Sequence, residues 1–110
     1  MDDSHGIAVY GRTGRGTEEH RGARVDIFVG TFGKAFGVNG GFIAGSAELI
    51  EAVRQKADTY IYTNPLGAAD CAAAVQAVDI ADGREGRDRL AHLKARTDQF
   101  RKGLTALGFV

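Results

Sequence analysis

A single lysine, Lys34, lies between small residues just after a short run of β-branched and aromatic residues. The run from Val25 to Val29 has the composition of a strand that is buried on both sides, and the glycines that follow it prevent a regular continuation. We therefore predict that Lys34 lies on a loop at the end of a strand. In open α/β sheets, ligands bind at this place.

Two chemical roles are open to Lys34. Gly33 and Ala35 flank it, so the lysine has no neighbouring carboxylate in the sequence to pair with. Burial favours the neutral form of an amine, which is nucleophilic toward a carbonyl group. The alternative is a solvated loop lysine. A phosphate-binding P-loop is excluded, because that motif needs a glycine and a hydroxyl residue where Phe28 and Ala35 stand.

Two carboxylates and a histidine stand near the beginning of the sequence, at Asp2, Asp3 and His5. Residues of these types at this spacing can form a metal site, a general acid and base pair or a clamp for a cofactor, and the segment alone does not select among them. A metal site would need further ligands, but the other two histidines are remote in sequence. The structural alternative is that Asp3 or Ser4 caps a helix and His5 lies in a turn.

Five segments of the chain occur in the order found in one enzyme family. They are DDSH at 2–5, GRTGRGTEE at 11–19, VDIFVGTFGKAFG at 25–37, GGF at 40–42 and YIYTNP at 60–65. Together they resemble the α-oxoamine synthases, which are pyridoxal 5′-phosphate (PLP) enzymes that condense an amino acid with an acyl-CoA. The interval of 32 residues from Asp2 to Lys34 also matches that family. The resemblance extends from Asp2 to about Phe109.

The resemblance implies a role for each of three residues near the cofactor ring. Lys34 would form the Schiff base with the cofactor and later move the α-proton of the substrate. Asp2 would pair with the pyridine nitrogen and keep it protonated, so that the ring can accept negative charge. His5 would hydrogen-bond the phenolic oxygen of the cofactor. Lys34 and His5 are therefore the predicted catalytic residues, and no metal is implied.

The resemblance implies three further residues at the cofactor phosphate. Thr31 matches a hydroxyl that contacts the phosphate within the same subunit. Thr63 and Asn64 match a pair that reaches the phosphate of the cofactor in a neighbouring subunit. The active site would then be shared across a homodimer.

The resemblance also implies the fold, which is α/β and forms part of the large domain of a fold-type-I PLP-dependent transferase. Its sheet would be mixed, mostly parallel and flanked by helices. Residues 1–107 would form the C-terminal part of the PLP-binding large domain, and residues 108–110 would begin a small domain. Family members are several hundred residues long, so we expect a fragment. Efficient catalysis by the isolated piece is not expected, because groups that position the substrate are missing.

The expected substrates are glycine or another small amino acid and an acyl-CoA. Within the family, the segments around Asp3 and at 11–19 are most similar to glycine C-acetyltransferase, and 8-amino-7-oxononanoate synthase comes second. Aminolevulinate synthases and serine palmitoyltransferases are less favoured. Two other classes stay open: a fold-type-I aminotransferase or lyase that uses Lys34 and Asp2 without an acyl-CoA, and an inactive remnant that only folds or dimerises.

Composition restricts the class of partner. The chain has 14 basic and 14 acidic residues, so we expect no nucleic-acid or membrane surface. Its single cysteine rules out an intramolecular disulfide and suits a reducing compartment. The apolar stretches are far shorter than the roughly 20 residues of a membrane span, and no signal peptide is visible. We therefore expect a cytoplasmic protein.

Hydrophobic spacing and turn residues predict the remaining elements. A chain of this length can form one modest domain, and folding would bury a little more than about 60% of the surface that the unfolded chain exposes. The predicted elements are a strand at 42–44, a helix after the capping residue Ser46 that extends to Ala57, a β-prone segment at 59–63, an alanine-rich helix at 68–81 that ends near Gly83, a helix at 86–107, and the start of a strand at 109–110.

Overall fold

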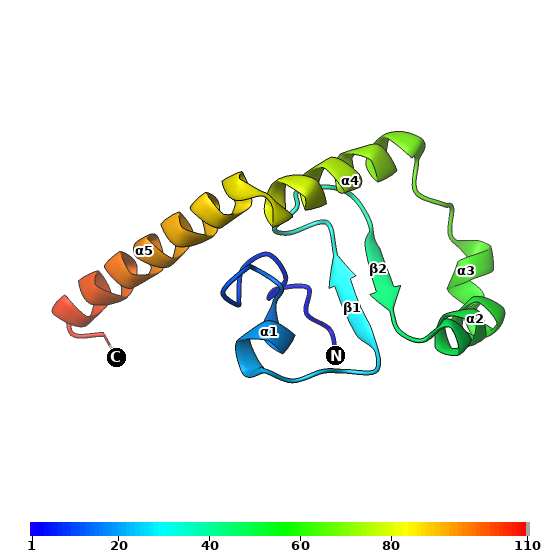
Figure 1. Ribbon diagram of the computed structural model, residues 1–110, viewed down its shortest axis with the longest axis horizontal. Helices are drawn as coiled ribbons and strands as arrows, with labels where there is room; N and C mark the ends of the chain where they lie inside the picture. Colours follow the sequence, from blue (N-terminus) through cyan, green and yellow to red (C-terminus); the bar gives the residue numbers. More distant parts are fainter. Residues whose placement is uncertain (110) are drawn as a thin grey trace.

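The computed structural model describes residues 1–109, in which one short helix and two short strands are followed by four helices. After an irregular first segment, the chain forms α1 (Thr17–Arg21), β1 (Phe28–Thr31), β2 (Gly41–Ala44), α2 (Ala47–Lys56), α3 (Asp58–Tyr62), α4 (Ala68–Asp82) and α5 (Arg84–Ala106). Figure 1 shows α4 crossing near the end of β1, with α1 and α2 on opposite sides of the two strands. The expected α/β class is confirmed.

The sheet is mixed. Strands β1 and β2 pair antiparallel, with Phe28 opposite Ala44 and Thr31 opposite Gly41. On its other edge β1 receives a parallel bridge between Asp2 and Val29. The parallel direction is therefore limited to this bridge in the part of the chain that the structure describes.

The predicted strand at 25–29 is displaced along the chain. The ladder begins only at Phe28 and continues to Thr31, because the backbone N–H of Val25 donates to Oε1 of Glu18 at 2.6 Å instead of to a neighbouring strand. The expected burial on both sides is also wrong for most of this run, since Ile27 is 41% exposed.

Three helices were predicted from their spacing and caps, and all three are present. Ser46 caps α2 by accepting a hydrogen bond from the backbone N–H of Leu49 at 3.2 Å. Helix α4 ends at Asp82 with Gly83 as its C-cap, as expected, and α5 begins at Arg84, two residues before its predicted start. Phe109 is not in a strand, and Val110 lies outside the described residues.

The β-prone segment at 59–63 is a helix, α3. Its backbone hydrogen bonds are local: Tyr60 N donates to Ala57 O at 2.9 Å, and Thr63 N donates to Thr59 O at 2.9 Å. Preference for the β conformation depends on packing against a neighbouring strand. No strand lies beside this segment among residues 1–109, so the local helical bonds prevail.

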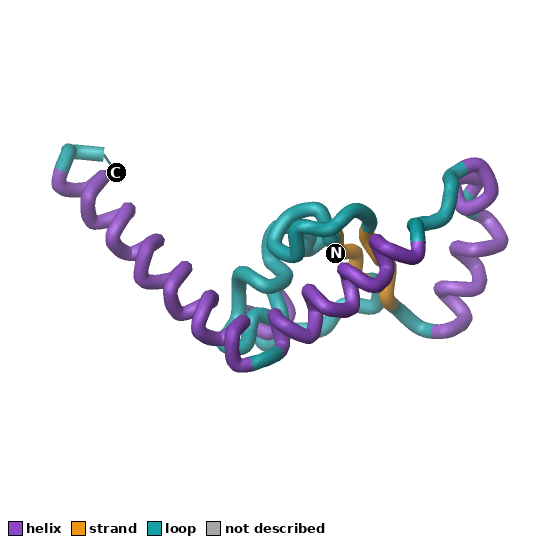
Figure 2. Tube along the Cα trace, turned by 90° about the horizontal axis from the view of Figure 1, so that it is seen from above, coloured by secondary structure: helices purple, strands orange, loops and turns teal. Residues whose placement is uncertain are grey.

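The expectation of a modest closed domain is wrong. The accessible surface is 8505 Å², whereas a compact protein of 11.7 kDa exposes about 5,900 Å². Among residues 1–109, Ala74 is the one buried apolar side chain, and it is still 6% exposed. Figure 2 shows α5 extending away from the rest of the chain, and the radius of gyration is 16.9 Å against about 13 Å for a compact chain.

Within the described residues, no helix combines the length with the apolar composition that crossing a bilayer requires.

Candidate functional site

Strand β1 positions Asp2 and Lys34 together. Two backbone bonds fix the segment around Asp2 to the middle of the strand: Asp3 N donates to Val29 O at 2.8 Å, and Val29 N donates to Met1 O at 2.9 Å. Lys34 lies on the loop that begins where β1 ends. The predicted place of Lys34, at the end of a strand, is therefore confirmed.

Hydrogen bonds and nearby charges act on the Asp2 carboxyl. Hydrogen bonds from Ser4, of which the backbone N–H bond measures 2.9 Å, hold the pKa of the Asp2 carboxyl below its ordinary value of 3.8. The positive charges of Lys34 and His5 lower this pKa further. The charges of both residues expected beside Asp2 at the cofactor ring therefore act on its carboxyl.

These three side chains lie on an open face. Asp2, His5 and Lys34 are all exposed, so Lys34 does not have the burial that would favour its neutral form. Residues 1–109 contain no cluster of three or more His, Cys, Asp or Glu side chains that could hold a metal ion. The acid, the imidazole and the amine are free to meet a ligand at this face.

The loop that carries Lys34 is held by its own backbone. Phe32 N donates to Gly40 O at 2.9 Å, Val38 N donates to Phe32 O at 2.8 Å, and Gly37 N donates to Lys34 O at 3.1 Å. Gly37 and Gly40 have φ angles of 65° and 107°, which favour glycine. The loop therefore has a defined shape before any ligand binds.

An aromatic cluster supports this loop from one face of the hairpin. Phe28 stacks on Phe42 at 6.0 Å between ring centroids, Phe42 meets Phe32 at 5.3 Å, and Phe32 meets Phe36 edge to face at 5.7 Å. Such pairs stabilise by about 0.5–1.5 kcal/mol each beyond the area they bury. The cluster reaches from the middle of the hairpin to Phe36, two residues after Lys34.

Thr31 shares a face of the sheet with Asp2. Asp2 is bridged to Val29, and directly paired residues and alternate residues of a strand project to the same side. The hydroxyl of Thr31 donates to Gly40 O at 3.0 Å and accepts from Gly33 N at 3.1 Å. This side chain therefore fixes the Lys34 loop, and its contact with a phosphate stays a prediction.

Thr63 and Asn64 lie exposed in the connection between α3 and α4. The same connection contacts the Lys34 loop, because a Cβ at Gly40 would lie only 2.7 Å from the side chain of Leu66. The structure does not test whether Thr63 and Asn64 reach a neighbouring subunit, so that role stays a prediction.

Asp3 was not predicted as a site residue, although it lies between Asp2 and Ser4. Its side chain is only 4% exposed. It accepts hydrogen bonds from the backbone N–H and the hydroxyl of Thr17, the first residue of α1. Asp3 is not the N-cap that the structural alternative expected, because the N-cap of α1 is Gly16; it binds the first residue of the helix from a distant position in the sequence. The signal in the sequence is the pair of adjacent carboxylates, which must face opposite sides of an extended segment.

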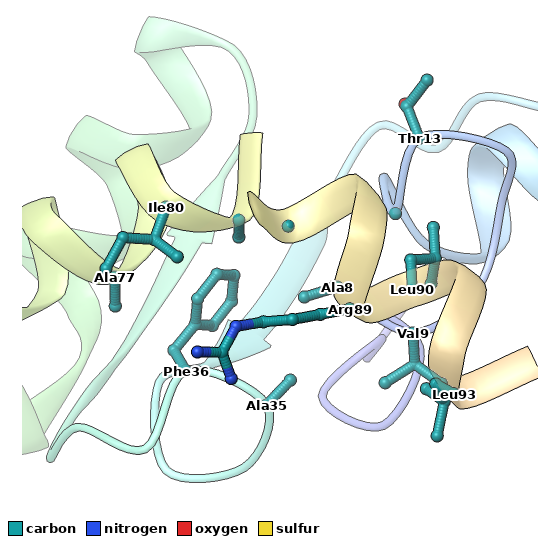
Figure 3. Close-up of a pocket in the computed structure, with 13 residues that line it drawn as sticks. Ala8, Val9, Thr13, Ala35, Phe36, Ala77, Ile80, Arg89, Leu90 and Leu93 are labelled. Carbon is teal, nitrogen blue, oxygen red and sulfur yellow. The ribbon is translucent and has the colours of Figure 1, made fainter. Parts of the chain in front are cut away.

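A pocket of about 500 Å³ lies behind the Lys34 loop. Its lining is mainly apolar and comes from the first segment, the loop, α4 and α5. Figure 3 shows Phe36 and Arg89 extending into this space. None of the predicted site residues lines it, so the pocket is separate from the open face that carries Asp2, His5 and Lys34.

One known protein family matches the whole length of the chain. The model of the family described as aminotransferase class I and II matches residues 1–110. The 8-amino-7-oxononanoate synthase of Thermosipho melanesiensis is 44% identical over 111 residues, which cover 99% of this chain and 28% of that protein. The chain therefore spans little more than a quarter of the length of this relative. From its sequence segments, the chain was expected to be most similar to glycine C-acetyltransferase, with 8-amino-7-oxononanoate synthase second.

Solved structures of similar proteins share the fold. Serine palmitoyltransferase from S. paucimobilis, with a bound PLP–myriocin aldimine, superposes with a TM-score of 0.88 at 30% identity, covering 99% of this chain and 28% of that chain. The 8-amino-7-oxononanoate synthase of Francisella tularensis gives a TM-score of 0.83 at 28% identity, covering 96% of this chain and 32% of that chain. Both similar proteins carry names of α-oxoamine synthases.

Proposed function

The chain belongs to the aminotransferase class I and II family, and on that premise we propose that it supplies part of the cofactor site of a PLP-dependent C-acyltransferase of the α-oxoamine synthase group. The reaction joins glycine or another small amino acid to the acyl group of an acyl-CoA. The observation that carries the proposal is that the exposed Asp2 is bridged to β1 and the exposed Lys34 lies on the loop where β1 ends, with the charge of Lys34 acting on the Asp2 carboxyl.

The residues present fit PLP. The cofactor has an aldehyde, a basic ring nitrogen, a phenolic oxygen and a phosphate, and the face offers an amine, a carboxylate, an imidazole and a hydroxyl. The low pKa of Asp2 keeps this carboxyl charged at neutral pH, which suits a protonated ring nitrogen. When bound, PLP supplies an electron sink that stabilises negative charge at the α-carbon of the amino acid.

Each of the three side chains has a definite task. Lys34 binds the cofactor through Nζ and moves the α-proton of the substrate as general base. Asp2 holds the proton on the ring nitrogen of the cofactor through its carboxylate. His5 donates a hydrogen bond to the phenolic oxygen and orients the ring. The backbone hydrogen bonds within the Lys34 loop, and the aromatic cluster that supports this loop, limit the positions that Lys34 can take.

Two hydroxyl groups and one side-chain amide are assigned to the cofactor phosphate. Thr31 contacts the phosphate in its own subunit, and Thr63 and Asn64 contact the phosphate in the partner subunit of a homodimer. The exposure of Thr63 and Asn64 supports this assignment, because it leaves both available to another chain. We further propose a cytoplasmic location, in keeping with the one cysteine, Cys71, which is free.

Borohydride reduction in the presence of PLP tests the cofactor site. Reduction fixes the cofactor covalently to the lysine that binds it, and peptide mass spectrometry then identifies that lysine. We expect label on Lys34 at PLP concentrations that leave Lys94, an exposed lysine of α5, unlabelled. Lys34→Ala removes the label and Lys94→Ala does not. Equal labelling of all lysines contradicts the proposal.

Acyl transfer is tested in a chimera, in which this chain replaces the matching segment of the Thermosipho melanesiensis relative. We expect free coenzyme A to be released from an acyl-CoA only when an amino acid and PLP are both present. Lys34→Ala in the chimera abolishes the release. A chimera that binds PLP and transfers an amino group to a 2-oxo acid, without releasing coenzyme A, favours an aminotransferase instead.

A further inference from the structure

Asp3 is the one buried charged side chain among residues 1–109. Its Oδ2 accepts a hydrogen bond from Thr17 N at 2.8 Å, and its Oδ1 accepts one from the Thr17 hydroxyl at 2.6 Å. A buried carboxylate is strongly destabilising unless both oxygens find such partners. The side chain therefore ties the segment of Asp2 and His5 firmly to the beginning of α1.

The backbone of Asp3 fixes the residues on either side of it. Its N–H donates to Val29 O at 2.8 Å, which sets the position of Asp2 at the edge of β1. Its carbonyl accepts from Gly6 N at 2.9 Å and from Ile7 N at 3.0 Å, and these two bonds close the turn that contains His5. One residue thus determines where both neighbours lie relative to the strand that leads to Lys34.

Two glycines make room for the Asp3 carboxylate. A Cβ added at Gly6 would collide with Oδ1, and one added at Gly16 would collide with Oδ2. Gly16 also has a φ of 83°, so its backbone can approach the carboxylate in a way that other residues rarely allow. The carboxylate is enclosed on both sides and cannot shift without moving one of these two backbone segments.

We propose that Asp3 is a positioning residue, which holds Asp2 and His5 in the orientation that cofactor binding requires. The inference rests on the proposed function, since it assigns those two residues to the cofactor. Asp3 acts through its neighbours and not by contact with the cofactor. The carboxylate accepts from both Thr17 groups, and its charge strengthens both bonds; an amide would be neutral and would have to reverse the hydroxyl bond, so that Thr17 Oγ1 accepts instead of donating.

The test uses two variants of the 110-residue chain, Asp3→Asn and Thr17→Val. Asp3→Asn removes the charge and replaces one accepting oxygen by a donor, so the hydroxyl bond is weakened or reversed, and Thr17→Val removes only the hydroxyl bond. The matched controls are Thr17→Ser, which keeps the hydroxyl, and Asp98→Asn, which makes the same chemical change on an exposed face of α5. Far-ultraviolet circular dichroism establishes that each variant retains its helices.

Two readouts need no cofactor. Nuclear magnetic resonance gives the pKa of the Asp2 carboxyl and the exchange rates of the Gly6 and Ile7 amides. In Asp3→Asn and Thr17→Val we expect this pKa to rise toward its ordinary value and both amides to exchange faster, because the turn is no longer held. The third readout is the PLP concentration at which half of Lys34 is fixed by borohydride, which we expect to increase about tenfold.

The controls should match the unsubstituted chain in all three readouts. The proposal is overturned if Thr17→Val keeps its helices and leaves the Asp2 pKa, the amide exchange and the PLP concentration unchanged. If Asp3→Asn does not fold, Thr17→Val decides alone. If the unsubstituted chain is never labelled at Lys34, the proposed function fails, and the Asp2 pKa and the amide exchange still decide the role of Asp3.

Discussion

The carboxylate of Glu19 binds Thr13 at three points. The backbone N–H of Thr13 lies 3.0 Å from Oε2 and 3.2 Å from Oε1, and its hydroxyl lies 3.0 Å from Oε1. Oε2 also accepts from Arg15 N at 3.2 Å. These bonds, the Thr13 N–H bond first among them, hold the pKa of Glu19 below its ordinary value of 4.5. One side chain thereby organises the glycine-rich loop at 11–16, which borders the apolar pocket.

Glu19→Gln should loosen this loop. A neutral amide has one accepting oxygen in place of two charged ones, so the Thr13 and Arg15 amides lose acceptors. We expect faster hydrogen exchange at both amides, measured by nuclear magnetic resonance. Glu51→Gln is the control, because Glu51 only accepts from the exposed Gln55 side chain on the same helix. Unchanged exchange at Thr13 in Glu19→Gln contradicts the prediction.

The same carboxylate predicts a pH dependence. Because the pKa of Glu19 is lower in the folded chain, its bonds contribute fully to stability at pH values above 4.5 and lose that contribution as the pH falls through the lowered pKa. Exchange at Thr13 should therefore accelerate on acidification in the unsubstituted chain, after correction for the intrinsic pH dependence of exchange. Glu19→Gln should lack this acceleration.

Ser4 should influence the Asp2 carboxyl more than Lys34 does. The hydrogen bonds from Ser4 are the main cause of the lowered pKa of Asp2, and the charge of Lys34 contributes less. Carbon-13 titration of Asp2 should show a larger rise in pKa in Ser4→Ala than in Lys34→Met. A larger rise in Lys34→Met would show that the charge of the lysine dominates this carboxyl.

The other serine of the chain provides the control. The backbone N–H of Glu48 is the main cause of the lowered pKa of its own carboxyl, and the hydroxyl of Ser46, which caps α2, lowers this pKa further. Ser46→Ala should therefore raise the pKa of Glu48 and leave that of Asp2 unchanged. Ser4→Ala should raise the pKa of Asp2 and leave that of Glu48 unchanged. This reciprocal result separates local hydrogen bonding from any general loss of structure.

Local signals in the sequence were sufficient for the elements that depend on local bonds. The glycines after β1 predicted the loop of Lys34, and Ser46 predicted the beginning of α2, because caps and turns use groups only a few residues apart. The segment at 59–63 was predicted wrongly since β propensity depends on a partner strand that this part of the chain does not meet.

Distant contacts could not be predicted in the same way. Adjacent carboxylates on an extended segment must face opposite sides, but the sequence does not say which side is buried. Asp3 is the buried one because Thr17 donates to it and because Gly16, thirteen residues along the chain, leaves space for it. The roles of Asp2 and Lys34 came from the resemblance to a family, and the structure adds that Asp2 is bridged to β1 and that Lys34 lies on the loop where β1 ends.

Gly30→Ala should destabilise the chain. Gly30 is buried beneath Phe42, and an added Cβ would lie 2.7 Å from Cζ of that ring, so the aromatic cluster must shift. Overpacking of this kind costs about 1–3 kcal/mol, measured by urea unfolding. Gly103→Ala is the matched control: nothing lies within 4 Å of its Cβ position in α5, so helix propensity should stabilise by up to about 1 kcal/mol. Equal effects at both positions contradict the packing argument.

Thr31→Val should weaken binding at the Lys34 loop. Valine has the shape of threonine but makes neither the bond to Gly40 O nor the bond from Gly33 N. Each such bond contributes about 0.5–1.5 kcal/mol to stability, so the loop becomes less ordered. We expect a higher PLP concentration for half-labelling of Lys34 by borohydride, and Thr31→Ser should restore the original value because it keeps the hydroxyl.

Labelling with pyridoxal, which lacks the phosphate, separates the two roles of Thr31. If the hydroxyl also contacts the phosphate, as proposed, Thr31→Val must weaken labelling by PLP more than labelling by pyridoxal. A variant that only loosens the loop affects both to the same degree, since both bind through the same aldehyde. Equal losses would therefore contradict the phosphate contact and leave Thr31 as a residue that shapes the Lys34 loop.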